Sequence, residues 1–340
     1  MVAIDRPSSP ILARELLIVS GMTESLPIID LTPCHGGDQA ALAALAKAVG
    51  RAAREVGFFY LTGHDIDRAF IAHVFAAAAL FFALPPEAKD KLSIRRSPHN
   101  RGYVAIKGES LDPSKPADLK EAFNIGLDLP AKDPRVLAGE PFRGVNLWPD
   151  LPGWRDAMLA YFDAVWATGR LLHRAIAVDL GMPPTFFEDK LDQPMATLRL
   201  LHYPPQPPAA DQGQIGAGEH TDYGNVTLLM TDEVGGLEVR RRDGTWLAAP
   251  VRPGSFICNI GDCLMRWTND VYVSTPHRVV NRGGRERYSI AFFLDPNPDA
   301  VVAALPTCVS ADRPAKYPPV TGADYLRSRL DATYKPLPAA

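Results

Sequence analysis

Apolar positions recur at helical spacing in the first half of the chain. The longest example is residues 154–180, where apolar or small side chains fall at alternating steps of four and three residues, a spacing that places them on one helix face. These positions are Met158, Phe162, Val165, Gly169, Leu172 and Ile176. Shorter helices are predicted at 40–56, 67–84 and 87–91, and strands at the apolar runs 26–31 and 57–61.

The second half of the chain has a different pattern. Between Thr197 and Leu294 it breaks into short β-type runs separated by glycine, proline and Asp-Gly turns. The runs are 198–203, 226–230, 237–240, 245–248, 255–260, 278–280 and 288–294. The Asp243-Gly244 pair is typical of a hairpin, and many short strands at this spacing predict a sandwich or a barrel. A last helix is predicted at 325–334.

Composition and charge exclude several classes of protein. The 340 residues are 46% apolar and 22% charged, with a formal net charge of −3. This balance argues against a disordered chain and against a basic nucleic-acid-binding protein. Four cysteines without a C-x-x-C pair are too few for a disulfide framework and do not form a zinc ribbon. We therefore expect a cytoplasmic protein with reduced thiols.

Targeting and nucleotide-binding motifs are absent from the sequence. The N-terminal residues lack the uninterrupted apolar stretch of a secretory signal. The most apolar run, 69–84, is shorter than the about 20 residues needed to cross a bilayer. No P-loop, G-x-S-x-G or H-E-x-x-H motif occurs. We expect a small-molecule substrate, no nucleic-acid or membrane partner, and either a monomer or a weak dimer.

One histidine–carboxylate pair stands out among the eight histidines. His220 and Asp222 lie two residues apart, so on an extended chain both side chains point to the same face and can bind adjacent positions of one metal ion. His277, 55 residues beyond Asp222, is the best candidate for a third ligand. Two histidines and one carboxylate leave three coordination positions open, as in non-haem Fe(II) oxygenases, although a zinc site could use the same residues.

A candidate anion site follows the metal motif. Arg287 and Ser289 share one face of a strand, with Arg287 ten residues beyond His277. A guanidinium fork beside a hydroxyl binds a carboxylate through charge-assisted hydrogen bonds. A dicarboxylic keto acid that chelates iron with one end would need such an anchor for its other end. The structural alternative is a salt bridge between Arg287 and a nearby acid.

These motifs resemble those of the iron(II)- and 2-oxoglutarate-dependent dioxygenases of the isopenicillin N synthase-like family. The resemblance spans about residues 26–334. It is carried by 28–30, 57–59, 81–85, 218–224, 259–262, 267–269, Ser274, 277–279 and 287–289. Within the family, the runs 100–103, 120–123 and 198–204 are most similar to thymine 7-hydroxylases, and bacterial ethylene-forming enzymes share part of this pattern.

The resemblance implies a mainly β fold with flanking helices. Its core would be a double-stranded β-helix, or jelly roll, with an N-terminal helical region and a C-terminal helix. The implied organisation is an N-terminal arm at 1–25, the N-terminal dioxygenase region at 26–195, the jelly-roll core at 196–300, and a C-terminal helix and tail at 301–340. These parts would form one compact catalytic unit.

The family also implies roles for individual residues. The implied iron ligands are His220, Asp222 and His277, and the implied 2-oxoglutarate contacts are Arg287, Ser289 and Tyr203. Many plant members carry asparagine two residues before that tyrosine, where this chain has Leu201. The substitution removes one polar contact to the cosubstrate.

The alternation of side chains along a strand predicts which residues contact the primary substrate. Arg199 and Tyr203 share one strand face, so a Tyr203 that faces 2-oxoglutarate places Arg199 in the interior as well. A buried guanidinium needs a partner, and no acid lies on that strand face. The partner is therefore either a carbonyl or carboxylate of the substrate or an acid from the helical region. Phe293 lies on the same strand face as Arg287 and is expected to form an apolar wall of the substrate site. The resemblance alone gives the same role to Tyr223.

The implied reaction couples oxidative decarboxylation of 2-oxoglutarate to hydroxylation of a small polar organic substrate, with Fe(II) as cofactor and O₂ as oxidant. An alternative within the family is an ethylene- and succinate-forming reaction that fragments 2-oxoglutarate itself. A non-catalytic sensor on the same fold is an alternative of another class. A zinc hydrolase is a further alternative, and it leaves Arg287 and Ser289 unexplained.

Overall fold

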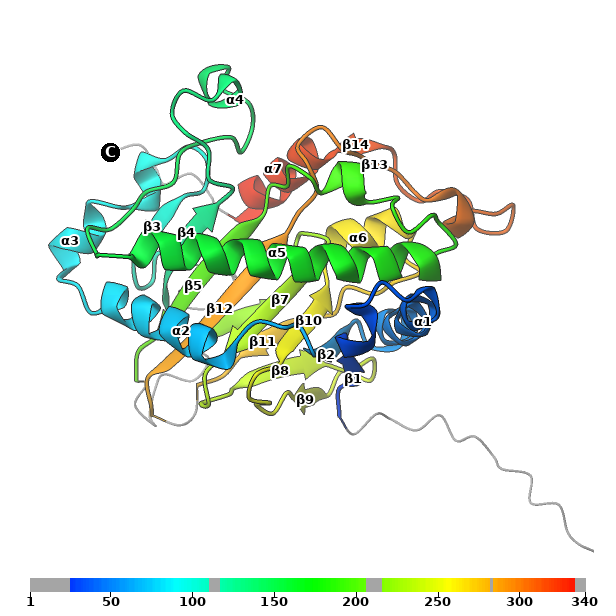
Figure 1. The fold of residues 1–340 in the computed structure, drawn as a ribbon, viewed down its shortest axis with the longest axis horizontal. Coiled ribbons are helices and arrows are strands. Elements are labelled where there is room, and N and C mark those ends of the chain that lie inside the picture. The colour runs from blue at the N-terminus through cyan, green and yellow to red at the C-terminus, as the bar shows by residue number, and fades with distance from the viewer. Residues whose placement is uncertain (1–24, 110–116, 206–215, 282–283, 334–340) are drawn as a thin grey trace, which may run out of the picture.

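The computed structural model describes residues 25–109, 117–205, 216–281 and 284–333. Its core is an eight-stranded sheet that faces a sheet of four strands (Figure 1). In spatial order the large sheet contains β1 (Ile28–Asp30), β2 (Phe58–Thr62), β10 (Phe256–Ile260), β7 (Val226–Thr231), β12 (Arg287–Leu294), β5 (Thr197–Tyr203), β4 (Glu121–Gly126) and β3 (Gly102–Val104). The small sheet contains β6 (Ala217–His220), β11 (His277–Val279), β8 (Leu237–Arg240) and β9 (Trp246–Ala248).

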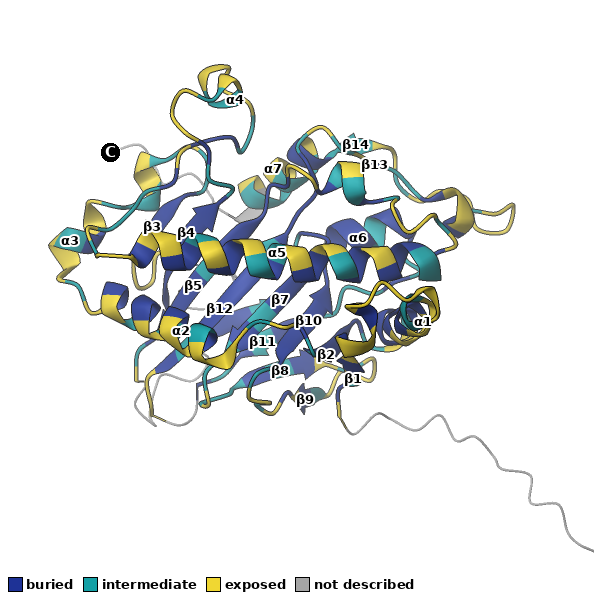
Figure 2. Cartoon of the chain, in the orientation of Figure 1, coloured by how far each residue is buried: buried dark blue, intermediate teal, exposed yellow. Residues whose placement is uncertain are grey.

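Three long helices cover the outer face of the large sheet. They are α1 (Gln39–Glu55), α2 (Arg68–Phe82) and α5 (Trp154–Asp179), of which α5 crosses β5, β12 and β7 (Figure 1). Figure 2 shows that the strands beneath are buried while the outward helix faces are exposed. All six apolar or small positions predicted to form one face of α5 are buried, which confirms that prediction.

The remaining α-helices and strands of the described residues lie around this core. They are α3 (Pro86–Asp90), α4 (Pro134–Leu137), α6 (Asp262–Trp267), α7 (Gly322–Thr333) and the pair β13 (Val301–Val302) and β14 (Val320–Thr321). The predicted C-terminal helix therefore begins three residues earlier than its apolar pattern indicated. In the described part of the chain, no helix combines the length and the apolar character needed to cross a membrane.

Local sequence determines where the first helices begin. The side chain of Asp38 accepts a hydrogen bond from the Ala40 amide, and that of Asp67 accepts one from the Phe70 amide. Aspartate is favoured at this position because the first amide groups of a helix have no partner within it. These caps set the starts of α1 and α2.

Strands β3 and β4 of the large sheet were not predicted. Every residue of β4 is buried, yet Glu121 and Asn124 interrupt its apolar pattern. The Glu121 carboxylate is satisfied by Lys89 Nζ at 2.8 Å, by the Tyr103 hydroxyl at 2.5 Å and by His202 Nδ1 at 2.7 Å. Tertiary partners thus allow a charged residue inside the sheet. With β1 and β2, these two strands mean that the segment 26–195 supplies four of the eight strands of the large sheet.

His173 on α5 should make the protein less stable in mild acid. Burial lowers the pKa of His173 from its ordinary 6.5 to about 4. Between these two pH values the unfolded chain binds a proton that the native protein does not. The free energy of unfolding therefore decreases as the pH is lowered, by about 3 kcal/mol in total. Urea unfolding at pH 7 and pH 4 should show this loss, and a His173→Gln variant should lack it. Equal pH dependence in the two proteins would contradict the prediction.

Candidate active site

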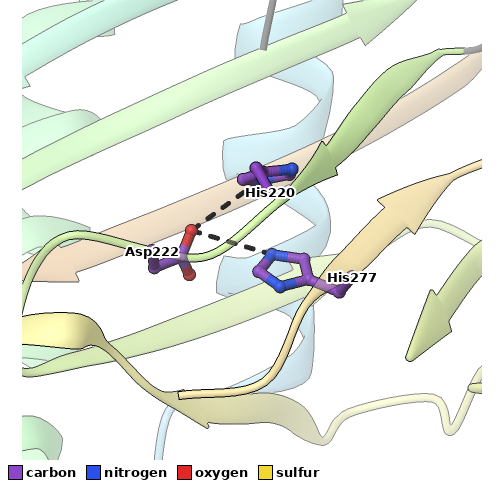
Figure 3. Close-up of side chains that lie close together, drawn as sticks. All are labelled: His220, Asp222 and His277. Atoms are coloured by element: carbon purple, nitrogen blue, oxygen red, sulfur yellow. Dashed lines mark ion pairs between the residues drawn. The ribbon is translucent and has the colours of Figure 1, made fainter. Parts of the chain in front are cut away.

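The three predicted metal ligands converge at the small sheet. His220 ends β6, and His277 begins β11 directly opposite it in the register. Asp222 Oδ1 lies 3.8 Å from His220 Nε2 and 3.7 Å from His277 Nε2 (Figure 3). One ligand atom from each residue lies within 4.8 Å of the others, and no second group of this kind occurs among the described residues.

Backbone contacts orient both imidazole rings. His220 Nδ1 lies 2.7 Å from the Gly218 carbonyl oxygen, and His277 Nδ1 lies 3.2 Å from that of Thr275. A carbonyl oxygen only accepts hydrogen bonds, so Nδ1 of each ring carries a proton, and Nε2 is the nitrogen left to face the site. Burial, followed by the neighbouring His277, lowers the pKa of His220 to about 3. The His220 ring therefore presents a neutral Nε2, the form that binds a metal.

One oxygen of the Asp222 carboxylate is held by hydrogen bonds, and the other faces the two histidines. Its Oδ2 accepts hydrogen bonds from Thr227 Oγ1 at 2.5 Å and from Asn259 Nδ2 at 2.7 Å. Burial alone would raise the pKa of Asp222, but the two histidines and these hydrogen bonds hold it below its usual value. The group is therefore an anion whose Oδ1 points at the two Nε2 atoms.

Arg287 is fully buried and incompletely satisfied. Its Nε donates to the Gly235 carbonyl at 2.5 Å and its Nη1 to Ser289 Oγ at 3.2 Å. The guanidinium lies over the ring of Tyr203, 4.6 Å from the ring centroid. Its Nη2 is buried and has no hydrogen-bond partner among the described residues. A buried cation with one unused donor edge is matched by an incoming carboxylate.

The paired strands β5 and β12 form one wall of the main cavity. In their register Tyr203 lies opposite Arg287, and Arg199 lies opposite Ala291. Arg199, Leu201 and Tyr203 all line the cavity, as strand parity predicts. The same cavity is lined by the three candidate metal ligands, so the metal group and the Arg287 anchor belong to one site.

The partner of Arg199 is an acid from the first half of the chain. Its Nη2 lies 2.5 Å from Oε2 of Glu109, which is also 3.6 Å from Lys120 Nζ. Lys120 pairs in turn with Asp118. The structural ion pair that the sequence left open is therefore present, and it forms a charged network on one side of the cavity.

Tyr223 and Phe293 both line the cavity, and the Arg329 guanidinium lies 4.9 Å from the centroid of the Tyr223 ring. Cavity residues to which the sequence assigned no individual role include Asn100, Glu109, Lys120, Asn124, Asp295, Leu326 and Leu330. Most of these lie on or beside β3, β4 and α7. Asp295 had a usable signal, because it continues the alternation of Arg287, Ser289, Ala291 and Phe293.

Two family descriptions match the chain. Residues 26–151 match "non-haem dioxygenase in morphine synthesis N-terminal", and residues 194–296 match "2OG-Fe(II) oxygenase superfamily". Among curated relatives, the 2-oxoglutarate-Fe(II) type oxidoreductase hxnY of Emericella nidulans is 39% identical over 314 residues, which cover 91% of this chain and 90% of the relative.

Solved structures agree with these matches. The full-length thymine 7-hydroxylase of Neurospora crassa in complex with alpha-KG superposes with a TM-score of 0.81 at 37% identity, covering 91% of this chain and 96% of that one. The complex of the same protein with alpha-KG and thymine has a TM-score of 0.80 at 36% identity, covering 91% and 97%. This similarity confirms the predicted jelly-roll fold with flanking helices. The chain belongs to the 2OG-Fe(II) oxygenase superfamily, in its isopenicillin N synthase-like group, and is an enzyme that uses Fe(II), 2-oxoglutarate and O₂ to hydroxylate a small organic substrate.

Proposed function

We propose that His220, Asp222 and His277 hold the Fe(II) through Nε2, Oδ1 and Nε2. The observation that carries this assignment is the orientation of the three ligand atoms toward one another. The other polar atoms of these side chains are already engaged by backbone carbonyls, Thr227 and Asn259. Two histidines and one carboxylate suit Fe(II) with open positions. When bound, Fe(II) with 2-oxoglutarate and O₂ supplies the oxidising power, and the cosubstrate leaves as succinate and CO₂.

The distal carboxylate of 2-oxoglutarate is bound by Arg287, Ser289 and Tyr203. The unused Nη2 of Arg287 supports this role, since a carboxylate would complete its hydrogen bonds. Ser289 Oγ already contacts the guanidinium, and the Tyr203 ring holds its plane. The three side chains form an anchor at one end of the cavity, with the candidate metal ligands in the same cavity.

The primary substrate occupies the part of the cavity lined by Arg199, Tyr223 and Phe293. Two aromatic rings and a polar side chain suit a small polar molecule with a flat ring. A structural relative, the thymine 7-hydroxylase of Neurospora crassa, has been solved with thymine, which supports a substrate of this size. We propose hydroxylation of such a molecule rather than fragmentation of 2-oxoglutarate.

A substrate screen tests this function. Nucleobases, amino acids and phenolics are added anaerobically to the protein loaded with Fe(II) and 2-oxoglutarate, and the absorption band of the complex is followed. A compound that perturbs the band should, in air, give equal amounts of succinate and hydroxylated product. Ethylene in the headspace without a hydroxylated product would favour the fragmentation reaction, and no succinate with any compound would favour a sensor.

Replacing Arg199 with glutamine should abolish substrate hydroxylation while 2-oxoglutarate binding and slow uncoupled succinate formation remain. The reason is that a substrate carbonyl or carboxylate would lose its charged donor. A lower melting temperature with near-normal hydroxylation would instead show that Arg199 serves only its ion pair. Glu109→Gln is the matched control, because it breaks the same ion pair and leaves the guanidinium in place.

The chain is also proposed to work in the reducing cytosol. All four cysteines, at positions 34, 258, 263 and 308, are buried free thiols. Buried unpaired thiols are typical of reducing compartments, whereas secreted domains form disulfides. Cell fractionation with an antibody to the chain tests this location.

A further inference from the structure

The cavity-facing side of β12 continues past the end of the strand. The alternating residues Arg287, Ser289, Ala291, Phe293 and Asp295 all line the cavity, while the residues between them face the helices or pack near them. Asp295 follows the last residue of the strand. At about 3.3 Å per residue it lies about 26 Å along the chain from Arg287. It therefore marks the end of the cavity that is remote from the 2-oxoglutarate anchor.

The carboxyl group of Asp295 is buried without a partner in the described part of the chain. The residue is 6% exposed, and it makes no hydrogen bond or ion pair with any residue that the structure describes. Its Oδ1 packs against Gly224 so closely that a Cβ there would lie 2.5 Å away. Burial, and then the negative charge of Asp222, raise the pKa of Asp295 to about 7. An unpaired carboxyl is unfavourable inside a protein and is kept where it has a use.

The surroundings of Asp295 differ from the opposite side of the cavity. On the β4–β5 side the cations Arg199 and Lys120 are paired with acids. Leu326 and Leu330 of α7 contribute apolar walls to the same cavity. Helix α7 begins beside the segment that follows Asp295, since the Ala323 amide donates to the Pro298 carbonyl oxygen at 2.9 Å. A ligand placed among these apolar walls would find in Asp295 an acceptor that the described residues leave unused.

We propose that Asp295 is a specificity-determining residue that accepts a hydrogen bond from an N–H or O–H group of the primary substrate. This inference rests on the proposed function and narrows its substrate class. The substrate carries a hydrogen-bond donor, such as a ring amide or a phenol, on the part that lies away from the 2-oxoglutarate anchor. A plain hydrocarbon, or a ring whose donors are all methylated, is rejected because it leaves the buried carboxyl unpaired.

The test compares probes that differ only in a donor group. The full chain is loaded anaerobically with Fe(II) and 2-oxoglutarate and titrated with thymine, 1,3-dimethylthymine, p-cresol and 4-methylanisole. We expect a donor-bearing probe to perturb the absorption band and its methylated counterpart to fail. The affinity of that probe should fall about tenfold or more in Asp295→Leu, and by no more than about threefold in Asp295→Asn, which keeps an acceptor oxygen.

Each outcome separates this inference from the function on which it rests. Asp163→Leu makes the same change on the exposed side of α5 and should leave probe affinity unchanged. Failure of the wild-type protein to form the Fe(II)–2-oxoglutarate band would overturn the proposed function, and this inference with it. If the band forms normally, any of three results would overturn this inference and leave the proposed function intact. They are that no donor-bearing probe perturbs the band, that Asp295→Leu binds the probe as well as wild type, or that the Leu and Asn variants lose affinity equally.

Discussion

Replacing Asp222 with alanine should abolish Fe(II)-dependent turnover of 2-oxoglutarate while the protein stays folded. Asp222 supplies the one carboxylate oxygen that faces both Nε2 atoms, at 3.8 and 3.7 Å. Without it two imidazoles remain, and the site loses both a ligand and its negative charge. We expect a loss of about 100-fold or more, because even residues that only support metal ligands are worth 10–100-fold. Succinate release by the purified variant, with circular dichroism to establish folding, measures the effect.

The two histidines and one outside residue complete this test. His220→Ala should behave like Asp222→Ala, because each removes one of the three converging atoms. Succinate production that survives in a folded His277→Ala protein would refute His277 as the third ligand. His73 on the exposed side of α2 is the matched control, and His73→Ala should turn over 2-oxoglutarate normally.

Removing the guanidinium of Arg287 should weaken 2-oxoglutarate binding by roughly 2–5 kcal/mol, since the carboxylate would be left buried and unpaired. The side chain is 0% exposed and its Nη2 has no partner among the described residues, so water does not replace the lost contact easily. Arg287→Lys should be partly tolerated, because a point charge replaces a planar fork and the contacts to Gly235 and Ser289 cannot both be kept.

Anaerobic titration of the Fe(II)-loaded protein with 2-oxoglutarate measures this loss. Arg155→Ala removes a guanidinium from the solvent-facing pair with Asp128 and should leave the Kd unchanged. An unchanged Kd in Arg287→Ala would remove Arg287 from the cosubstrate site. The metal variants and the Arg287 variants are also expected to differ in metal content, because only the former alter the ligand set.

The amino-acid sequence by itself determined the features that depend on local geometry. The three- and four-residue spacing of 154–180 was enough to predict the buried face of α5, because a helix brings such positions to one side. The alternation of a strand likewise placed Arg199 on the same face as Tyr203, and Ser289 on the same face as Arg287, and all four line one cavity. His220 and Asp222, two residues apart in the sequence, also have neighbouring side chains in the structure, although Asp222 lies just beyond the strand.

Only the tertiary structure decided which polar groups are satisfied and which are left for a ligand. Glu121 looks unsuited to a buried strand until Lys89 and His202 are brought to it from distant segments. Arg199 and Asp295 are both ionisable side chains on inward-facing positions, but the fold supplies Glu109 to Arg199 and no described partner to Asp295. The physical reason is that burial makes a charge costly and a partner far along the chain can remove that cost. Chain folding, rather than local pattern, determines where that partner lies.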